Sequence, residues 1–165
     1  MRWLVIVLYV AIIYSTLSIA RDIVNSIRSI GILEITTYIC VSIFFLILMF
    51  SNIKNISKKQ ILYRIVLIIF FIALVGSVAS LPEEKMHIIE YGLLGWLIAW
   101  AIGNNKKSKF FYMTLGILLG WIIGWGDEII QYYLPNRVYD IRDVLLNGLS
   151  VTIGFLFFQI SKSKG

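Results

Sequence analysis

The stretch IVLIIFFIALVGSVASL, residues Ile65–Leu81, contains no charged side chain and is nearly long enough to cross a lipid bilayer as a helix. A spanning helix needs about 20 mostly apolar residues. Five further apolar runs occur at Trp3–Ala20, Ile30–Phe50, Met86–Gly103, Phe110–Gly126 and Val144–Ile160. Several runs are slightly short, and flanking side chains can extend them by snorkelling. The sequence therefore predicts an all-α, polytopic helical membrane protein with about six transmembrane helices.

The composition is typical of one small membrane domain covering residues 1–165. The chain is 59% hydrophobic, has a mean hydropathy of +0.88 and carries a net charge of +6. In a soluble protein a basic balance can indicate nucleic acid, but here Lys and Arg lie between apolar runs. Cytoplasmic loops and anionic headgroups explain that placement better. We therefore expect membrane lipids as partners and no nucleic acid.

Basic residues are distributed unevenly between the two sides of the predicted bundle. If the N-terminus is cytoplasmic, ten of the fifteen fall on the inner side, and five fall on the outer side together with all nine acids. Because cytoplasmic loops carry an excess of Lys and Arg, we expect both termini in the cytoplasm. The inner residues are Arg2, Lys54, Lys58, Lys59, Arg64, Lys106, Lys107, Lys109, Lys162 and Lys164, and the outer ones are Arg21, Arg28, Lys85, Arg137 and Arg142.

Two features of the N-terminal region add detail to this topology. Residues 21–30, RDIVNSIRSI, carry apolar side chains at roughly helical spacing, which is typical of an amphipathic helix lying in the membrane interface. The tripeptide Ser18-Ile19-Ala20 resembles a cleavage site, so the first run can alternatively be read as a signal peptide, although it is longer than a usual signal core. Cleavage would leave the direction of the other spans unchanged.

Ionisable residues gather in two short strings, EEKMHIIEY (Glu83–Tyr91) and DEIIQYYLPNRVYDIRDVLLN (Asp127–Asn147). Charge beside hydrocarbon is costly and usually marks a working site. With the predicted topology, three helix ends bring the strings to one depth on the outer side. They supply Lys85, His87, Glu90, Asp127, Glu128, Gln131, Arg137, Asp143 and Asn147.

These residues have structural explanations as well as functional ones. His87, the only histidine, can anchor its helix end through a carboxylate, or it can act as a proton shuttle, phosphate partner or metal ligand. Arg137 can bind a phosphate bidentately. His87 with Glu128 or Asp127 can act as acid and base, and the same carboxylates can hold a divalent cation. Asp143 can instead be a helix-start acid, and spacing does not choose among these alternatives.

Glycines recur every four residues in the fifth predicted span, at Gly116, Gly120 and Gly124. Small residues at this spacing let two membrane helices pack closely. The alternative is that they leave room for a lipid tail.

The region of about residues 80–160 carries a set of motifs made of Lys85, His87, Tyr91, Leu94 and Gly95, followed by Asp127, Glu128, Gln131, Pro135, Arg137, Asp143, Asn147 and Gly154. This pattern, D-E-x-x-Q with P-x-R and D-x-x-x-N, resembles the VanZ-like family of small bacterial membrane proteins. The chain departs from the family at Asn136, where Gly is usual, and at Ser150, where a small Gly is common. The first two spans match only as hydrophobic helices.

The resemblance implies a bacterial plasma-membrane protein that acts at the extracytoplasmic leaflet on a cell-envelope lipid or lipid-linked precursor. It also implies a link to resistance against lipoglycopeptides of the teicoplanin type. Whether the chain is an enzyme stays open: a hydrolase or transferase at a phosphate or acyl ester is one form. A non-catalytic module that binds a lipid or the antibiotic is another. A small transporter fits less well, because transport routes place polar groups near the bilayer midplane.

Roles follow for the polar residues under the enzyme hypothesis. We expect catalysis by His87, Glu128 and Asp127. Substrate binding is expected from Lys85, Tyr91, Gln131, Arg137, Asp143 and Asn147. The only cofactor that the sequence suggests is a divalent cation at the carboxylates.

Overall fold

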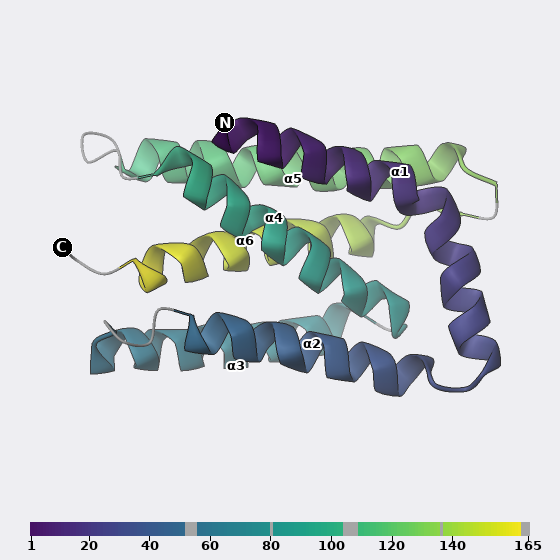
Figure 1. The fold of residues 1–165 in the computed structure, drawn as a ribbon, viewed down its shortest axis with the longest axis horizontal. Helices are drawn as coiled ribbons and strands as arrows, with labels where there is room; N and C mark the ends of the chain where they lie inside the picture. Colours follow the sequence, from purple (N-terminus) through teal and green to yellow (C-terminus); the bar gives the residue numbers. More distant parts are fainter. Residues whose placement is uncertain (52–55, 80, 104–108, 136, 163–165) are drawn as a thin grey trace.

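The computed structural model describes residues 1–51, 56–79, 81–103, 109–135 and 137–162, and within these ranges it is helical without β-strands (Figure 1). This confirms the predicted all-α class. The elements are α1 (Arg2–Ser29), α2 (Leu33–Phe50), α3 (Lys58–Val78), a 3₁₀ turn η2 (Glu83–Lys85), α4 (Met86–Ile102), α5 (Lys109–Tyr133) and α6 (Ile141–Ser161). The predictions for Lys54, Lys106, Lys107, Asn136 and Lys164 lie outside the described residues.

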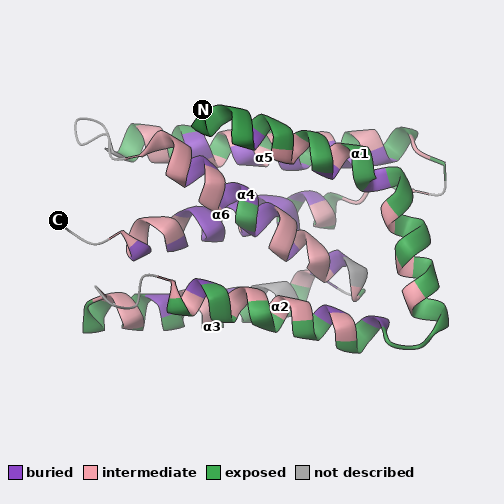
Figure 2. Cartoon of the chain, viewed as in Figure 1, coloured by how far each residue is buried: buried purple, intermediate pink, exposed green. Residues whose placement is uncertain are grey.

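Five of these helices are long and apolar enough to cross a membrane: α1, α2, α3, α5 and α6. The exception, α4, has 17 residues, and the 3₁₀ turn η2 lies directly before it in the chain. Many large apolar residues of α1, α2 and α3 are exposed. Buried residues concentrate in α4 and α6, as Figure 2 shows. The molecule is therefore a bundle in which α4 and α6 form the centre and the other helices face lipid.

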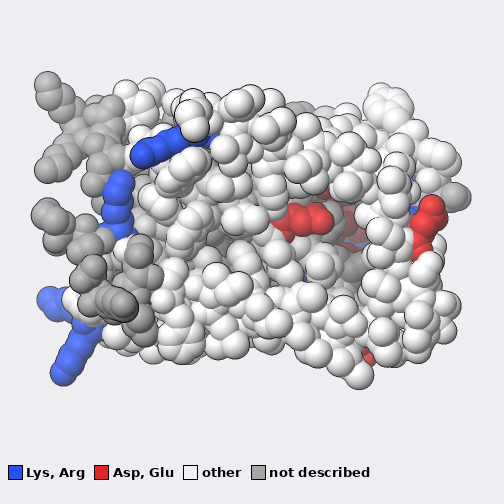
Figure 3. Space-filling view, in the orientation of Figure 1, with Lys and Arg blue, Asp and Glu red and all other residues white. Residues whose placement is uncertain are grey.

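The acidic residues gather at one end of the bundle, where basic residues lie as well, whereas the other end is basic. Arg2, Lys58, Lys59 and Lys162 lie at the helix ends where α1 and α3 begin and α6 finishes, which we call the basic end. The opposite end, where α1 and α5 finish and α4 and α6 begin, carries Glu84, Glu128, Asp140 and Asp143, and we call it the acidic end. Figure 3 shows Lys and Arg side chains gathered on the left of this face, with Asp and Glu in its middle and right.

Helix α1 bends past its middle, and its second half crosses the acidic end at a steep angle to the bundle (Figure 1). The hydroxyls of Ser15 and Thr16 bond back to the Ile12 carbonyl, each at 3.0 Å. Such back-bonding competes with the helix ladder and bends helices. The interfacial helix predicted for residues 21–30 is thus the turned continuation of α1, which ends at Ser29. Their path across the end of the bundle is the one that an interfacial helix takes.

The centre of the bundle is a close approach of two backbones. A Cβ atom on Gly154 of α6 would run into the Gly92 carbonyl of α4, and one on Gly95 would run into the Val151 carbonyl. Small residues permit such crossings because no side chain separates the helices. The side chains of Tyr91 and Val151 beside this crossing are fully buried.

The glycine face of α5 is also packed. A Cβ on Gly116 would meet Phe155, one on Gly120 would meet Val151, and one on Gly124 would meet Asn147. These neighbours lie on α6 and fill the space along the glycines. The close-packing explanation of the four-residue repeat is therefore the correct one for these positions, and no lipid tail is needed to fill them.

At the basic end a buried arginine joins three helices. Arg64 of α3 donates from Nη1 to the carbonyls of Leu48, at 3.3 Å, and Met49, at 2.5 Å, and from Nη2 to Ser161 Oγ at 2.6 Å. The last carbonyls of a helix lack partners within it, so the guanidinium completes the end of α2. This contact attaches α2 and α3 to α6.

Gly154→Ala should lower the stability of the folded protein, because the new methyl group meets the Gly92 carbonyl and neither backbone can step aside. Overpacking of this kind costs about 1–3 kcal/mol. Gly76→Ala is the matched control, because nothing lies within 4 Å of a Cβ there and Ala favours a helix by roughly 0.5–1 kcal/mol over Gly. Thermal unfolding in detergent should show a lower midpoint for the first variant only. Equal midpoints would mean that this crossing does not hold the bundle together.

Candidate functional site

Three helix ends meet at the acidic end and surround a group of polar side chains, which we call the polar site. Pro82 and η2 lead the chain into α4, α5 finishes at Tyr133, and Asp140 caps α6 by accepting a 2.8 Å hydrogen bond from the Arg142 backbone N–H. Helix starts favour Pro and acidic residues, which explains the local sequence at both starts. The polar site consists of His87, Glu90, Tyr91, Asp127, Glu128, Gln131, Arg137, Asp143 and Asn147.

Glu128 lies at the middle of the polar site and is fully buried. Its Oε1 accepts a 2.9 Å hydrogen bond from Gln131 Nε2, and its Oε2 accepts a 3.2 Å bond from the Asp140 backbone N–H. One bond comes from a residue one turn along α5, and the other comes from the start of α6. The carboxylate is therefore held in one orientation while each oxygen keeps a second lone pair for another partner.

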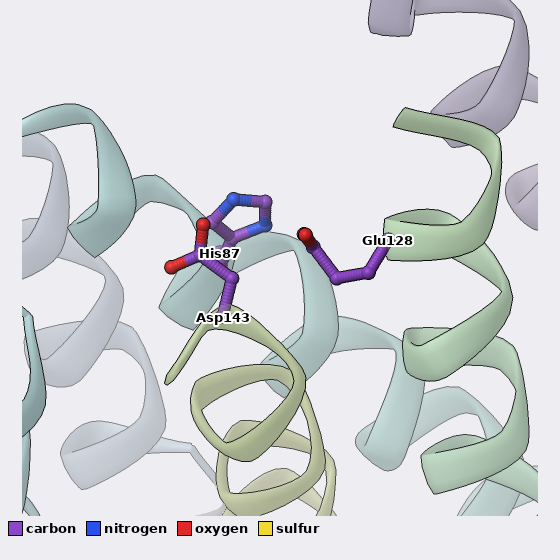
Figure 4. A group of neighbouring side chains, drawn as sticks. All are labelled: His87, Glu128 and Asp143. Atoms are coloured by element: carbon purple, nitrogen blue, oxygen red, sulfur yellow. The ribbon is translucent and has the colours of Figure 1, made fainter. Parts of the chain in front are cut away.

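His87 enters the polar site from the first turn of α4 and points toward Glu128 and Asp143, as Figure 4 shows. A ligand atom from each of these three side chains lies within 4.8 Å of the other two. The His87 Nδ1 atom lies 3.8 Å from Glu90 Oε2 and 4.0 Å from Asp127 Oδ2. The imidazole thus sits among four carboxyl groups, at distances that suit ion pairing or a bridging ligand better than direct hydrogen bonds.

Asp127 and Asn147 are both fully buried, one on α5 and the other on α6. Asp127 Oδ2 accepts a 3.3 Å hydrogen bond from Gln131, and Asn147 Nδ2 donates a 3.1 Å bond to the Gly124 carbonyl. The Asn147 Oδ1 atom is buried without a hydrogen-bond partner among the described residues, as are His87 Nδ1 and Arg137 Nε. Nearly all buried polar atoms in proteins are paired, so these atoms point to a ligand or to water.

Arg137 reaches the polar site from the connection between α5 and α6. Its Nη2 donates a 3.2 Å hydrogen bond to the Leu17 carbonyl of α1, while its Nε is buried without a partner among the described residues. The guanidinium is close enough to interact electrostatically with His87, Glu90 and Asp127. It is the cation of the site, with one edge attached to α1 and one buried donor still available.

Asp140 and Arg142 form a pair of their own at the rim. Two guanidinium nitrogens of Arg142 donate to Asp140 Oδ2, at 3.0 Å and 2.5 Å. These hydrogen bonds hold the pKa of Asp140 below its usual range. Asp140 is therefore charged and already balanced, and it serves the site by capping α6 and presenting its backbone N–H to Glu128.

The structure places Lys85 differently from the other predicted site residues. Its Nζ lies 3.3 Å from the Tyr38 hydroxyl and 5.0 Å from the centre of the Tyr38 ring, on α2. His87, Tyr91, Asp127, Glu128, Gln131, Arg137, Asp143 and Asn147 are brought together. A role for Lys85 in binding stays a prediction, and in this conformation the side chain contacts α2.

Sequence reasoning missed three residues that support the site. The hydroxyl of Tyr9 donates to the Glu90 carbonyl at 3.0 Å, and the hydroxyl of Tyr14 donates to the Ile123 carbonyl at 2.6 Å. Both tyrosines come from α1 and attach that helix to the polar parts of α4 and α5. Asp140 is the third, through its cap and its backbone bond to Glu128. Polar tyrosines within an apolar run were the one available signal, but the run alone does not identify their partners.

The donor set allows three kinds of chemistry. One imidazole and neighbouring carboxylates can move a proton, a guanidinium with a free donor can hold an anion, and a mixed nitrogen and oxygen cluster can hold a metal ion. Burial strengthens each of these, because opposite charges attract more strongly away from water.

Comparisons with known proteins agree with the motifs. A family model described as VanZ/LLP1 matches residues 3–162, which includes all six helices and every residue of the polar site. No curated protein and no solved structure matches the chain. Because the match covers nearly the whole chain, the first two helices are included as well as the motif-bearing half. The protein therefore belongs to the VanZ/LLP1 family of membrane proteins.

Proposed function

We propose that the protein binds the headgroup of a cell-envelope lipid or lipid-linked precursor in the polar site, at the extracytoplasmic leaflet of a bacterial plasma membrane. Binding there would lower susceptibility to lipoglycopeptides of the teicoplanin type. Membership of the VanZ/LLP1 family and five membrane-length apolar helices support the membrane part of the proposal. The excess of Lys and Arg at the basic end supports the orientation, with the acidic end outside.

The observation that carries the proposal is the set of buried atoms left unpaired in one region. Among the described residues, His87 Nδ1, Arg137 Nε and Asn147 Oδ1 have no hydrogen-bond partner. Each unsatisfied buried group costs about 1–3 kcal/mol. A fold that gathers these atoms from three segments of the chain is suited to completion by a polar ligand.

The mixture of donors and acceptors indicates the chemistry of that ligand. Arg137 offers a planar donor suited to a phosphate. The carboxylates of Asp127 and Glu128 would repel a simple anion, but they accept hydrogen bonds from hydroxyl or amino groups. A phosphate joined to a sugar or another hydroxyl-rich headgroup supplies both kinds of partner, and its lipid tail would stay in the bilayer beside α4 to α6.

Catalysis at this site would be hydrolysis or group transfer at a phosphate or acyl ester. His87 and Glu128 stand close enough to share a reacting group, and Arg137 would hold the anion beside them. The non-catalytic version uses the same contacts to retain the lipid or the antibiotic. The two versions differ in the role of the Glu128 carboxylate: an enzyme needs it to take up and release a proton, whereas a binding module needs only its hydrogen bonds.

Reporter fusions should place both the C-terminus and the α4–α5 connection in the cytoplasm. A fusion at Gly165 and another within residues 104–108 should each report a cytoplasmic location. The reason is that ten of the fifteen basic residues lie on this side, and loops rich in Lys and Arg stay in the cytoplasm during membrane insertion. A fusion in the α5–α6 connection, next to Arg137, should report the opposite side. An extracytoplasmic signal at Gly165 would move the polar site to the inner leaflet and end this version of the proposal.

In cells that the protein protects from a lipoglycopeptide, Arg137→Ala, His87→Ala and Glu128→Gln should each remove protection. Arg137→Lys should protect only in part, because it keeps the charge and loses the planar fork. Tyr132→Phe is the control, since Tyr132 is two-thirds exposed on the same helix as Glu128. The measurement is the inhibitory drug concentration in cells that make matched amounts of folded protein.

Each outcome of this experiment separates one version from another. Full protection by Glu128→Gln would exclude its carboxylate from any chemical step and favour a binding module. Lost protection with the co-purified lipid still present, by mass spectrometry, would favour an enzyme. Full protection by all three variants would contradict the whole proposal.

A further inference from the structure

We propose that His87, Glu128 and Asp143 are the ligands of a zinc-class divalent metal ion. The inference rests on the polar site of the proposed function, and it assigns His87 and Glu128 to the ion in place of direct proton transfer. The three side chains come from the beginnings of α4 and α6 and the end of α5, and they converge in Figure 4. One ligand atom from each lies within 4.8 Å of the other two.

The geometry is close to that of a bound ion. Zinc–nitrogen and zinc–oxygen bonds are about 2.0–2.2 Å long, so two ligand atoms on one tetrahedral ion lie about 3.4 Å apart. The three ligand atoms, which lie within 4.8 Å of one another, would move inward to reach that spacing. Three protein ligands leave a fourth position for water or substrate, the arrangement of catalytic rather than structural zinc sites.

The donor types select the class of ion. One imidazole and two carboxylates suit zinc and similar transition metals, whereas calcium and magnesium favour sites made only of oxygen. The single cysteine, Cys40, lies on α2 and away from the helix ends that form the site. A thiolate-rich site is therefore not available to this cluster, and an N,O,O set is the one that the structure provides.

Asp127 supplies the second, independent observation. It is fully buried, and its Oδ2 lies 4.0 Å from His87 Nδ1, a buried atom without a hydrogen-bond partner among the described residues. Metal-bound histidines usually donate their second ring N–H to a carboxylate, which orients the ring. A ring turned slightly toward Asp127 would give this nitrogen its partner. Asp127 is then a positioning residue for the metal ligand.

Glu128 is oriented in advance, and the surrounding charge favours a cation. Its two hydrogen bonds, from Gln131 and the Asp140 N–H, fix the carboxylate and leave a lone pair on each oxygen. Around His87 stand the carboxyl groups of Glu90, Asp127, Glu128 and Asp143. Among the described residues, Arg137 is the guanidinium that interacts electrostatically with the imidazole. Buried carboxylates need a proton, a partner or a metal ion, and a divalent ion balances two of them.

The test uses full-length protein without a histidine tag, so that His87 is the only histidine present. The protein is purified in detergent, and a chelator removes bound metal. Zinc added back should remain at about one ion per chain after gel filtration, as measured by elemental mass spectrometry. X-ray absorption at the zinc edge should show nitrogen and oxygen neighbours with the signature of one imidazole and no sulfur. Because the chain has one histidine, that signature belongs to His87.

Variants separate ligands from neighbours. His87→Ala and Asp143→Asn should each lose the bound ion, and Asp127→Asn should weaken zinc binding by about 10- to 100-fold, as the loss of such partners does. Tyr132→Phe should bind zinc like the unchanged protein. Arg137→Lys should keep zinc while losing part of its protection against the drug, which separates metal binding from headgroup binding. The zinc content of a variant is compared with that of the unchanged protein only when both have the same helical content and the same gel-filtration elution volume, which shows that the variant is folded.

The proposal is overturned by less than stoichiometric zinc in the unchanged protein, by zinc retained after His87→Ala, or by a sulfur neighbour. If His87→Ala does not fold, the same conclusions are drawn from Asp143→Asn and Asp127→Asn, with unchanged zinc affinity in both variants counting against the site. None of these results alters the expected drug sensitivity of Arg137→Ala, so the headgroup proposal can survive the loss of the metal proposal.

Discussion

The contact between the backbones of α4 and α6 determines where the functional groups lie. Gly92 and Gly95 of α4 meet Gly154 and Val151 of α6 with no side chain between the helices. His87 and Asp143 each lie eight residues before their helix's contact residue, Gly95 or Val151, which is about 12 Å along a helix. Two helices that start at the same end and touch at this point carry both side chains to the same depth.

Helix α5 adds the third side of the site through the same device. Its glycines let Val151 and Asn147 of α6 approach the α5 backbone, and the Asn147 amide donates to the Gly124 carbonyl. Asp127 and Glu128 follow Gly124 by one turn. Close packing in the apolar half of the bundle therefore fixes the position of the carboxylates in the polar half, so a rigid core supports a site with several atoms still unpaired.

Buried ionisable groups at a membrane depth are tolerated when the protein supplies most of their partners. Gln131, the Asp140 N–H and the Leu17 carbonyl do so for Glu128 and Arg137. The helix ends contribute because their backbone groups have no partners inside the helix. The atoms that remain unpaired come from α4, the α5–α6 connection and α6, and their gathering distinguishes a binding site from a set of helix caps.

Hydropathy predicted the helices, because a run of about 20 apolar residues has few other folds available in lipid. The two polar strings also predicted which residues would meet, since alternating spans bring their ends to one side. Tyr9 and Tyr14 were missed because their partners are more than 80 residues away. The placement of Lys85 on Tyr38 was missed because α2 has no motif that marks it as a neighbour of η2.

Charge balance connects the two proposals for the polar site. Asp140 is paired with Arg142 at the rim, so it adds no net charge inside. The four inner carboxylates outnumber the Arg137 guanidinium, and a divalent ion held by His87, Glu128 and Asp143 would offset two of them. With the ion and Arg137 both present, the site would have two centres that attract an anion, one of them with an open coordination position. A phosphate-bearing headgroup would then be held between the ion and the guanidinium, and without the ion Arg137 alone would attract its phosphate while the carboxylates accept hydrogen bonds from its hydroxyl groups.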